Sequence, residues 1–287
     1  MRWEEGRESE NVEDRRGMPG GPVMMTGGIG TLVIIVLALV FGIDPQALLG
    51  PQQGMQPPGA QQQQQQFPGP EGAEDELKHF VRRILADTED VWRAQFRQMN
   101  KQYRDPHLVL FSGKVDSACG FASAAVGPFY CPPDQRVYLD LSFFEQMRRQ
   151  FHVNGDFADA YVIAHEVGHH VQNLLGISER VSRARGQVSE REYNQLSVRL
   201  ELQADFLAGM WAHHAQMMKQ YLDESDIEAA IKAASAIGDD RLQKQARGYV
   251  VPDSFTHGTS AQRVRWFSLG LKSGNLADGD TFNTDDL

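Results

Sequence analysis

The sequence predicts an α+β fold, mostly helical with a small sheet, preceded by one transmembrane helix. Three observations predict it. Apolar residues recur at helical spacing in several segments of residues 74–287. Short apolar runs between Gly, Pro and Asp residues are typical of strands. Residues 24–43 form an uncharged, largely apolar run that is about as long as a bilayer-spanning helix.

The first 73 residues divide into three parts. Residues 1–16 are dense in charge and poor in apolar residues, so we expect a disordered cytoplasmic tail that extends to residue 23. We expect a transmembrane helix over residues 24–43 rather than a cleaved signal peptide, because no clear cleavage site follows the apolar run. Residues 44–73 are rich in Gln, Pro and Gly, and we expect a linker there.

Basic residues lie close to only one end of this predicted span. The arginines that precede it are Arg2, Arg7, Arg15 and Arg16. No Lys or Arg follows it before Lys78. The positive-inside rule therefore predicts a single-pass membrane protein with a cytoplasmic N-terminus. Residues 74–287 would form one extracytoplasmic domain, in the periplasm or on the cell surface, of a size that is usual for a single core.

The start of this domain shows two kinds of apolar pattern. We expect one or two amphipathic helices over residues 74–100, because apolar side chains recur there mostly every three or four positions. The three short apolar runs of the predicted small sheet are residues 108–111, 121–126 and 137–141. A net charge of −10, without a basic stripe interleaved with aromatic residues, argues against a nucleic-acid partner.

The chain has two cysteines, Cys119 and Cys131, with glycines and a proline between them. In an oxidising compartment outside the membrane we expect them to form a disulfide that closes a short loop. Two buried free thiols are the alternative. Metal ligation by this pair is disfavoured because no second pair lies nearby.

The motif His165-Glu166-Val167-Gly168-His169 lies in an apolar, helix-compatible stretch, residues 158–175. On an α-helix, histidines four positions apart lie on one face and can bind the same tetrahedral zinc ion. Glu166 is then placed to take a proton from a zinc-activated water, as the general base of a peptidase. The alternative is a set of side chains that only make hydrogen bonds, although burying them without a partner is costly.

A second long helical pattern, residues 189–221, carries Glu201 and Asp205 on one face. Two acids in an apolar helix need something positive opposite them. We expect Glu201 to be the third ligand of one zinc ion per chain, and Asp205 to accept the ring N–H of a ligating histidine. The alternative is a solvated face on which both acids pair with basic residues. The rival ligands are His170, His213 and His214.

The last candidate is His257, in a Gly-containing loop before a helix that Thr259 or Ser260 would cap. A histidine there could donate a proton to the oxyanion that forms when an amide carbonyl is attacked. An ordinary hydrogen-bonded or surface histidine is the alternative. Weaker candidates for the same role are Tyr130, Tyr138 and Tyr193.

Four motifs carry a resemblance to a known family: GPFYCPPDQRVYLDLSFF, HEVGHH, ELQADFLAG and FTHGTSAQR. With these motifs in this order, the chain resembles the putative neutral zinc metallopeptidase family of membrane-anchored bacterial proteins. The resemblance implies a zincin-like metallopeptidase domain with zinc on His165, His169 and Glu201, and with Glu166 catalytic. By analogy with zincins, residues 136–140 are our candidate for the edge strand that holds the substrate in extended form.

These residues together predict a membrane-anchored zinc metallopeptidase, a hydrolase that cuts peptides or proteins. Two alternatives stay open, namely a non-catalytic zinc-bound interaction module and a zinc hydrolase that acts on a non-peptide substrate. Glu166 argues against the first, because a structural zinc site does not need this carboxylate and usually has four protein ligands. The second would use the same ligands, so only its products would distinguish it.

Overall fold

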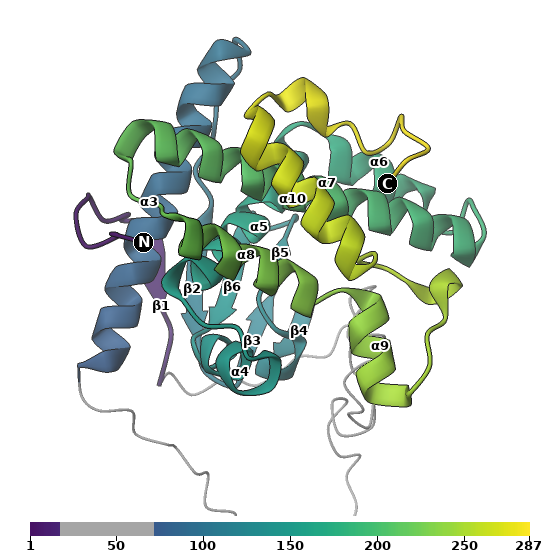
Figure 1. The fold of residues 1–287 in the computed structure, drawn as a ribbon, viewed down its shortest axis with the longest axis horizontal. Coiled ribbons are helices and arrows are strands. Elements are labelled where there is room, and N and C mark those ends of the chain that lie inside the picture. Colours follow the sequence, from purple (N-terminus) through teal and green to yellow (C-terminus); the bar gives the residue numbers. More distant parts are fainter. Residues whose placement is uncertain (18–71) are drawn as a thin grey trace, which may run out of the picture.

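The computed structural model describes residues 1–17 and 72–287 of the chain. In this part of the chain, helices pack on one face of a four-stranded sheet (Figure 1). The strands are β1 (Val12–Asp14), β2 (His107–Phe111), β3 (Lys114–Ser117), β4 (Gly120–Ser123), β5 (Phe129–Cys131) and β6 (Arg136–Asp140). The helices are α3 (Ala73–Gln98), α4 (Ser142–Phe151), α5 (Asp156–Leu174), α6 (Ile177–Ala184), α7 (Glu190–Lys219), α8 (Glu224–Ala236), α9 (Asp239–Arg247) and α10 (Ser260–Ser273). The prediction of a mostly helical fold with a small sheet is confirmed.

The four-stranded sheet has an apolar core on each face. Leu108 and Leu110 of β2 point into the main core with the helices, whereas Val109 and Phe111 point into a smaller core shared with β3 and β4. Because β2 is buried on both faces, its sequence is continuously apolar rather than alternating. The smaller core also contains Cys131, which the structure pairs with Cys119 in a disulfide.

Residues 136–140, the candidate substrate-binding edge strand, do not lie at an edge. The strand order is β1-β2-β6-β5, so β6 is bonded to β2 on one side and to β5 on the other. Over residues 136–138 both sides of the strand are paired, so these residues have no free backbone groups for a substrate. The prediction is wrong because the apolar pattern reports that a strand is buried and not where it lies in the sheet.

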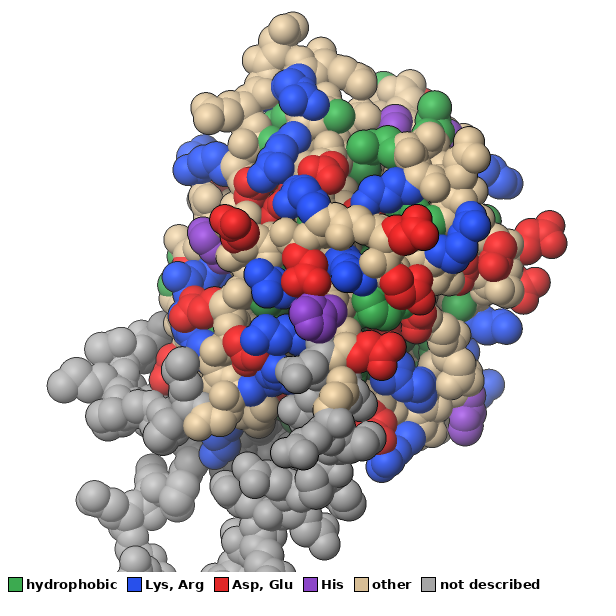
Figure 2. All heavy atoms as spheres, turned by 90° about the vertical axis from the view of Figure 1, so that its left-hand side faces the viewer, with side chains coloured by type: hydrophobic (Ala, Val, Ile, Leu, Met, Phe, Trp, Pro, Cys, Tyr) green, Lys and Arg blue, Asp and Glu red, His purple; other side chains and the backbone are tan. Residues whose placement is uncertain are grey.

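The N-terminal segment, residues 1–16, is part of the folded domain, so the prediction of a disordered tail is wrong. β1 pairs in parallel with β2. The buried carboxylate of Glu89 in α3 accepts hydrogen bonds from Arg7, Ser9 and Asn11. Figure 2 shows this side of the molecule, where acidic and basic side chains alternate. Backbone pairing and ion pairs hold the segment, and these leave no apolar pattern in the sequence.

The prediction of a membrane anchor also needs correction. Among residues 1–17 and 72–287, no helix combines the length and the apolar character needed to cross a membrane. The predicted span, residues 24–43, and the linker up to residue 71 lie outside the described residues. The predicted single-pass localisation puts β1 in the cytoplasm and β2 outside the membrane. Strands that pair must lie on the same side of a membrane, so the predicted topology, with the N-terminus and the domain on opposite sides, is wrong.

Three glycines let helices α5, α7 and α10 pack closely. A Cβ atom at Gly168 of α5 would lie 3.0 Å from the carbonyl oxygen of Ala204 in α7. At Gly209 of α7 or Gly270 of α10, a Cβ atom would lie 2.0 Å from a carbonyl oxygen of the opposing helix. Only glycine permits such backbone contacts, and α10 consequently lies directly across α7 (Figure 1).

Candidate metal centre

Two adjacent helices bring three candidate ligands together. α5 carries His165 and His169 one turn apart, and α7 carries Glu201. The start of α7 is fixed by a capping box in which Ser189 and Glu192 each accept the backbone N–H of the other. The close contact at Gly168 brings α7 near enough for the Glu201 carboxylate to face both imidazole rings.

The candidate ligand atoms lie close together, all within 4.8 Å of one another. Nε2 of His165 lies 3.2 Å from Oε2 of Glu201, and Nε2 of His169 lies 3.4 Å from Oε1. Ligands about 2.0–2.1 Å from a tetrahedral zinc are about 3.3–3.4 Å from one another. Burial raises the pKa of Glu201, but the charges of His169 and His257 outweigh it and hold this pKa well below its usual value. The three residues could therefore hold a metal ion.

A buried ion-pair network orients His165. Its Nδ1 lies 2.9 Å from Oδ1 of Asp205, and since a carboxylate only accepts, Nδ1 donates this hydrogen bond, which leaves Nε2 as the ring atom that faces Glu201 and could bind a metal. Asp205 also accepts two hydrogen bonds, at 2.8 and 3.0 Å, from the buried guanidinium of Arg263 in α10, and a third from the Tyr161 hydroxyl. Burial alone would raise the pKa of Asp205, but Arg263 and His165 lower it to about 2.

A glutamine orients His169 in the same way. Nδ1 of His169 lies 2.9 Å from Oε1 of Gln172. The amide nitrogen of Gln172 donates to the carbonyl oxygen of Leu200 and to Oε1 of Gln203, so Oε1 of Gln172 is its accepting atom. His169 therefore donates from Nδ1 and, like His165, turns its Nε2 toward Glu201.

Glu166 lies in α5 beside both ligand histidines and is 8% exposed. Its carboxylate makes no hydrogen bond to any other residue in the described part of the chain. Burial raises the pKa of Glu166, and the charges of His169 and His165 oppose this rise. A raised pKa makes a carboxylate a stronger base, which favours its role as a proton acceptor.

The loop between α9 and α10 places His257 near the cluster. Asp239, the first residue of α9, accepts the backbone N–H groups of Thr256, His257 and Gly258 at 2.8, 2.6 and 3.0 Å. Nδ1 of His257 faces the same carboxylate at 3.3 Å. Burial lowers the pKa of His257, but the charges of Asp239 and Glu201 outweigh it and raise the pKa. Gly258, which follows His257, packs against α7 on either side of Glu201, since a Cβ atom at Gly258 would lie 3.3 Å from the side chain of Val198 and 3.2 Å from that of Leu202.

The rival ligands lie elsewhere. His170 is fully buried and bonds to the Tyr130 hydroxyl and the Arg104 carbonyl oxygen. The rings of His213 and His214 bond to carbonyl oxygens at the C-terminal end of α10. In the described part of the chain, the group that could hold a metal consists of the two histidines of α5 and Glu201.

Sequence reasoning did not predict three residues that position the site, namely Gln172, Asp239 and Arg263. Gln172 had a usable signal, because it follows His169 by three positions and so lies on the same face of α5. Arg263 also had a usable signal, because it is a cation among the apolar residues of α10 and could neutralise a buried acid. Asp239 had no such signal in the sequence, because its hydrogen-bond partners lie 17 to 19 residues away in a loop without periodicity.

The chain is similar in sequence to proteins of Escherichia coli and Mycobacterium bovis. A sequence model described as "Putative neutral zinc metallopeptidase" matches residues 1–282. The chain is 49% identical to uncharacterized protein YpfJ of Escherichia coli (strain K12), over 98% of this chain and 99% of the relative. It is 43% identical to uncharacterized protein Mb2605 of Mycobacterium bovis, over 74% of each chain. No solved structure matches it. The chain therefore belongs to the putative neutral zinc metallopeptidase family.

Proposed function

We propose that this protein is a zinc-dependent peptidase that hydrolyses peptide bonds in peptides or proteins. The proximity of Glu201 to Nε2 of His165 and of His169 carries the proposal, since the three residues offer ligand atoms that lie within 4.8 Å of one another, close enough to share one zinc ion per chain. Three protein ligands are the pattern of a catalytic zinc site, in which a fourth position stays open. When bound, zinc supplies a Lewis acid that lowers the pKa of a water molecule and polarises a carbonyl group.

Glu166 is the proposed general base. Its carboxylate accepts a proton from the water that attacks the scissile carbonyl carbon, and then delivers it to the nitrogen of the departing amine. The buried setting that raises its pKa supports both steps, because a carboxyl group must hold the proton between them. Asp205 and Gln172 keep the two ligand imidazoles in the required tautomer.

The test of this proposal is cleavage of a mixed peptide library by the full chain, read by mass spectrometry. The full chain is needed because residues 1–16 belong to the domain. We expect cuts by the zinc-loaded protein, none after a chelator has removed the metal, and the same cuts after zinc is restored, with one zinc per chain by elemental analysis. A protein that holds one zinc and cuts no peptide would overturn the proposal.

His257 is the proposed proton donor to the oxyanion, with its Nδ1 held by Asp239. We expect His257→Ala to lower kcat by about 10²–10³-fold with little change in KM or in bound zinc, because the lost hydrogen bond forms only in the transition state. Steady-state kinetics on a peptide found in the library would measure this. The matched control is His107→Ala, at an exposed histidine of β2. Equal kcat values in the two variants would remove His257 from the reaction.

A further inference from the structure

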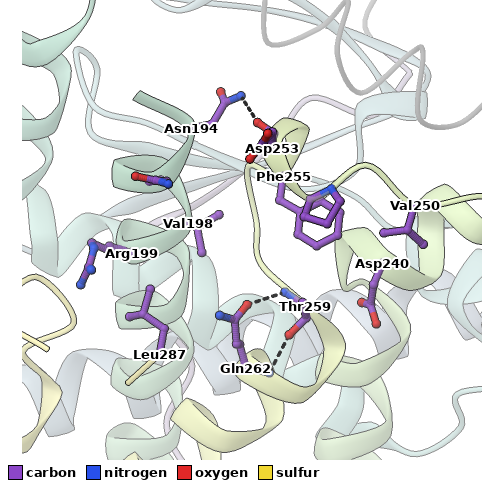
Figure 3. Close-up of a pocket in the computed structure, with 12 residues that line it drawn as sticks. Asn194, Val198, Arg199, Asp240, Val250, Asp253, Phe255, Thr259, Gln262 and Leu287 are labelled. Carbon is purple, nitrogen blue, oxygen red and sulfur yellow. Dashed lines mark hydrogen bonds between the residues drawn. The ribbon is translucent and has the colours of Figure 1, made fainter. Parts of the chain in front are cut away.

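A pocket of about 520 Å³ lies between the N-terminal half of α7 and the loop that leads into α10 (Figure 3). Val198 of α7 and Phe255 of the loop lie on opposite sides of it, and Val250 and Leu287 complete its apolar lining. The volume falls within the range of about 300–1,000 Å³ that is usual for ligand pockets. The pocket is thus large enough for a bulky amino-acid side chain.

The pocket adjoins the candidate metal centre through both of its walls. Val198 precedes Glu201 by three residues, a rise of about 4.5 Å along α7. Gly258, which follows His257, packs against Val198, since a Cβ atom at Gly258 would lie 3.3 Å from Cγ1 of the valine. An extended peptide advances about 3.3 Å per residue. A side chain two or three residues from a peptide bond held at the metal would lie about 7–10 Å along the peptide from that bond, and the pocket wall at Val198 is about one helical turn from Glu201.

Apart from the exposed Gln195, the polar side chains around the pocket are bonded to the protein itself. Asn194 donates to a carbonyl oxygen of the facing loop at 3.1 Å, and Arg199 donates to two carbonyl oxygens of the C-terminal segment. Gln262 accepts the backbone N–H of Thr259, and Asp240 accepts from the first residue of α10. With these groups engaged, the pocket offers mainly apolar contacts to a ligand.

Exposed apolar side chains continue the pocket onto the surface. Tyr249, Val250 and Val251 are consecutive and are 61, 38 and 36% exposed. Among the described residues, they make up half of the exposed large apolar side chains. Exposed apolar residues that cluster rather than scatter mark a binding surface.

We propose that this pocket binds an apolar side chain of the peptide substrate, two or three residues from the bond that is cut. This inference rests on the proposed peptidase function. It gives that function a substrate class, namely peptides with a bulky apolar residue such as Leu, Met or Phe at one fixed distance from the scissile bond. Acidic residues at that position are disfavoured, since two carboxylates, Asp240 and Asp253, line the pocket against one cation, Arg199.

The experiment uses the zinc-loaded full chain and a set of peptides that differ only at this position. We expect kcat/KM to be at least about tenfold higher for Leu, Met or Phe than for Ala or Glu. Val250→Asp should remove this preference while peptides with Ala are still cut, because it puts a charge on the exposed rim of the pocket. Val198→Phe should shift the preference toward small side chains, because it fills the pocket from α7.

Met217→Asp is the control, since it makes the same apolar-to-acidic change at a 68% exposed residue near the far end of α7. It should keep the wild-type preference. If the wild type, Val250→Asp and Val198→Phe all cut with the same side-chain preference, the proposed role of the pocket would be wrong. The proposed peptidase function would still stand. If the zinc-loaded wild type cut none of these peptides and no library peptide, both the proposed role of the pocket and the proposed peptidase function would be wrong.

Discussion

Glu166→Gln is expected to bind one zinc ion as tightly as the wild type and to lose about 10²–10⁴-fold in kcat. The substitution keeps the size of the side chain and leaves His165, His169 and Glu201 unchanged. An amide, however, cannot take a proton from the attacking water or return it to the departing amine. Zinc content by elemental analysis and kcat on a peptide cut by the wild type would separate the loss of the base from the loss of the metal.

Two further variants make this result specific. Glu179→Gln makes the same change at an exposed carboxylate of α6 and should keep full activity. His169→Ala should lose both zinc and activity, because it removes a proposed ligand. If Glu166→Gln retained the kcat of Glu179→Gln, Glu166 would not be the base, whatever metal the site holds.

Arg263→Met is expected to lower the free energy of unfolding by about 3–5 kcal/mol, the usual effect of leaving a buried charge without its partner. Arg263 is 2% exposed, and its guanidinium makes two hydrogen bonds to the fully buried Asp205. We also expect zinc affinity to fall about 10–100-fold, because Asp205 would no longer be fixed against His165. Urea unfolding of the metal-free protein and a zinc titration would measure the two effects separately.

The neighbouring ion pair provides the control. Arg265 lies in the same helix, but it and its partner Asp286 are both largely exposed, so Arg265→Met should cost at most about 1 kcal/mol. The double variant Arg263→Met with Asp205→Asn should recover part of the stability but not the zinc affinity, because it removes the unpaired charge. A loss of stability in Arg263→Met no larger than in Arg265→Met would contradict the proposed role of the network.

The parts of the site that the sequence predicts are those in which spacing along one helix fixes position. His165 and His169 share a face of α5 because they are four residues apart, as Glu201 and Asp205 do on α7. The sequence also predicts that these buried acids need a positive partner, and the partner of Asp205 is Arg263 from α10. Which segment supplies that charge depends on tertiary packing, so the spacing alone does not identify it.

The fold departs from prediction where backbone contacts decide the structure. Residues 1–16 have few apolar side chains, and their place in the domain comes from pairing with β2 and from bonds to the buried Glu89. The position of β6 between two strands depends likewise on hydrogen bonds that any sequence of similar burial could make. Such contacts leave no periodic signal, whereas the apolar faces of α5 and α7 do.

The place of β1 in the sheet also affects the order of folding during synthesis. β1 is the first strand of the described sheet to leave the ribosome, but its partner β2 is made only after the whole of α3. Contacts between residues so distant in sequence raise the contact order, which slows folding. β1 must therefore remain unpaired while the following residues are translated, and its pairing with β2 joins two strands that are synthesised at well-separated times.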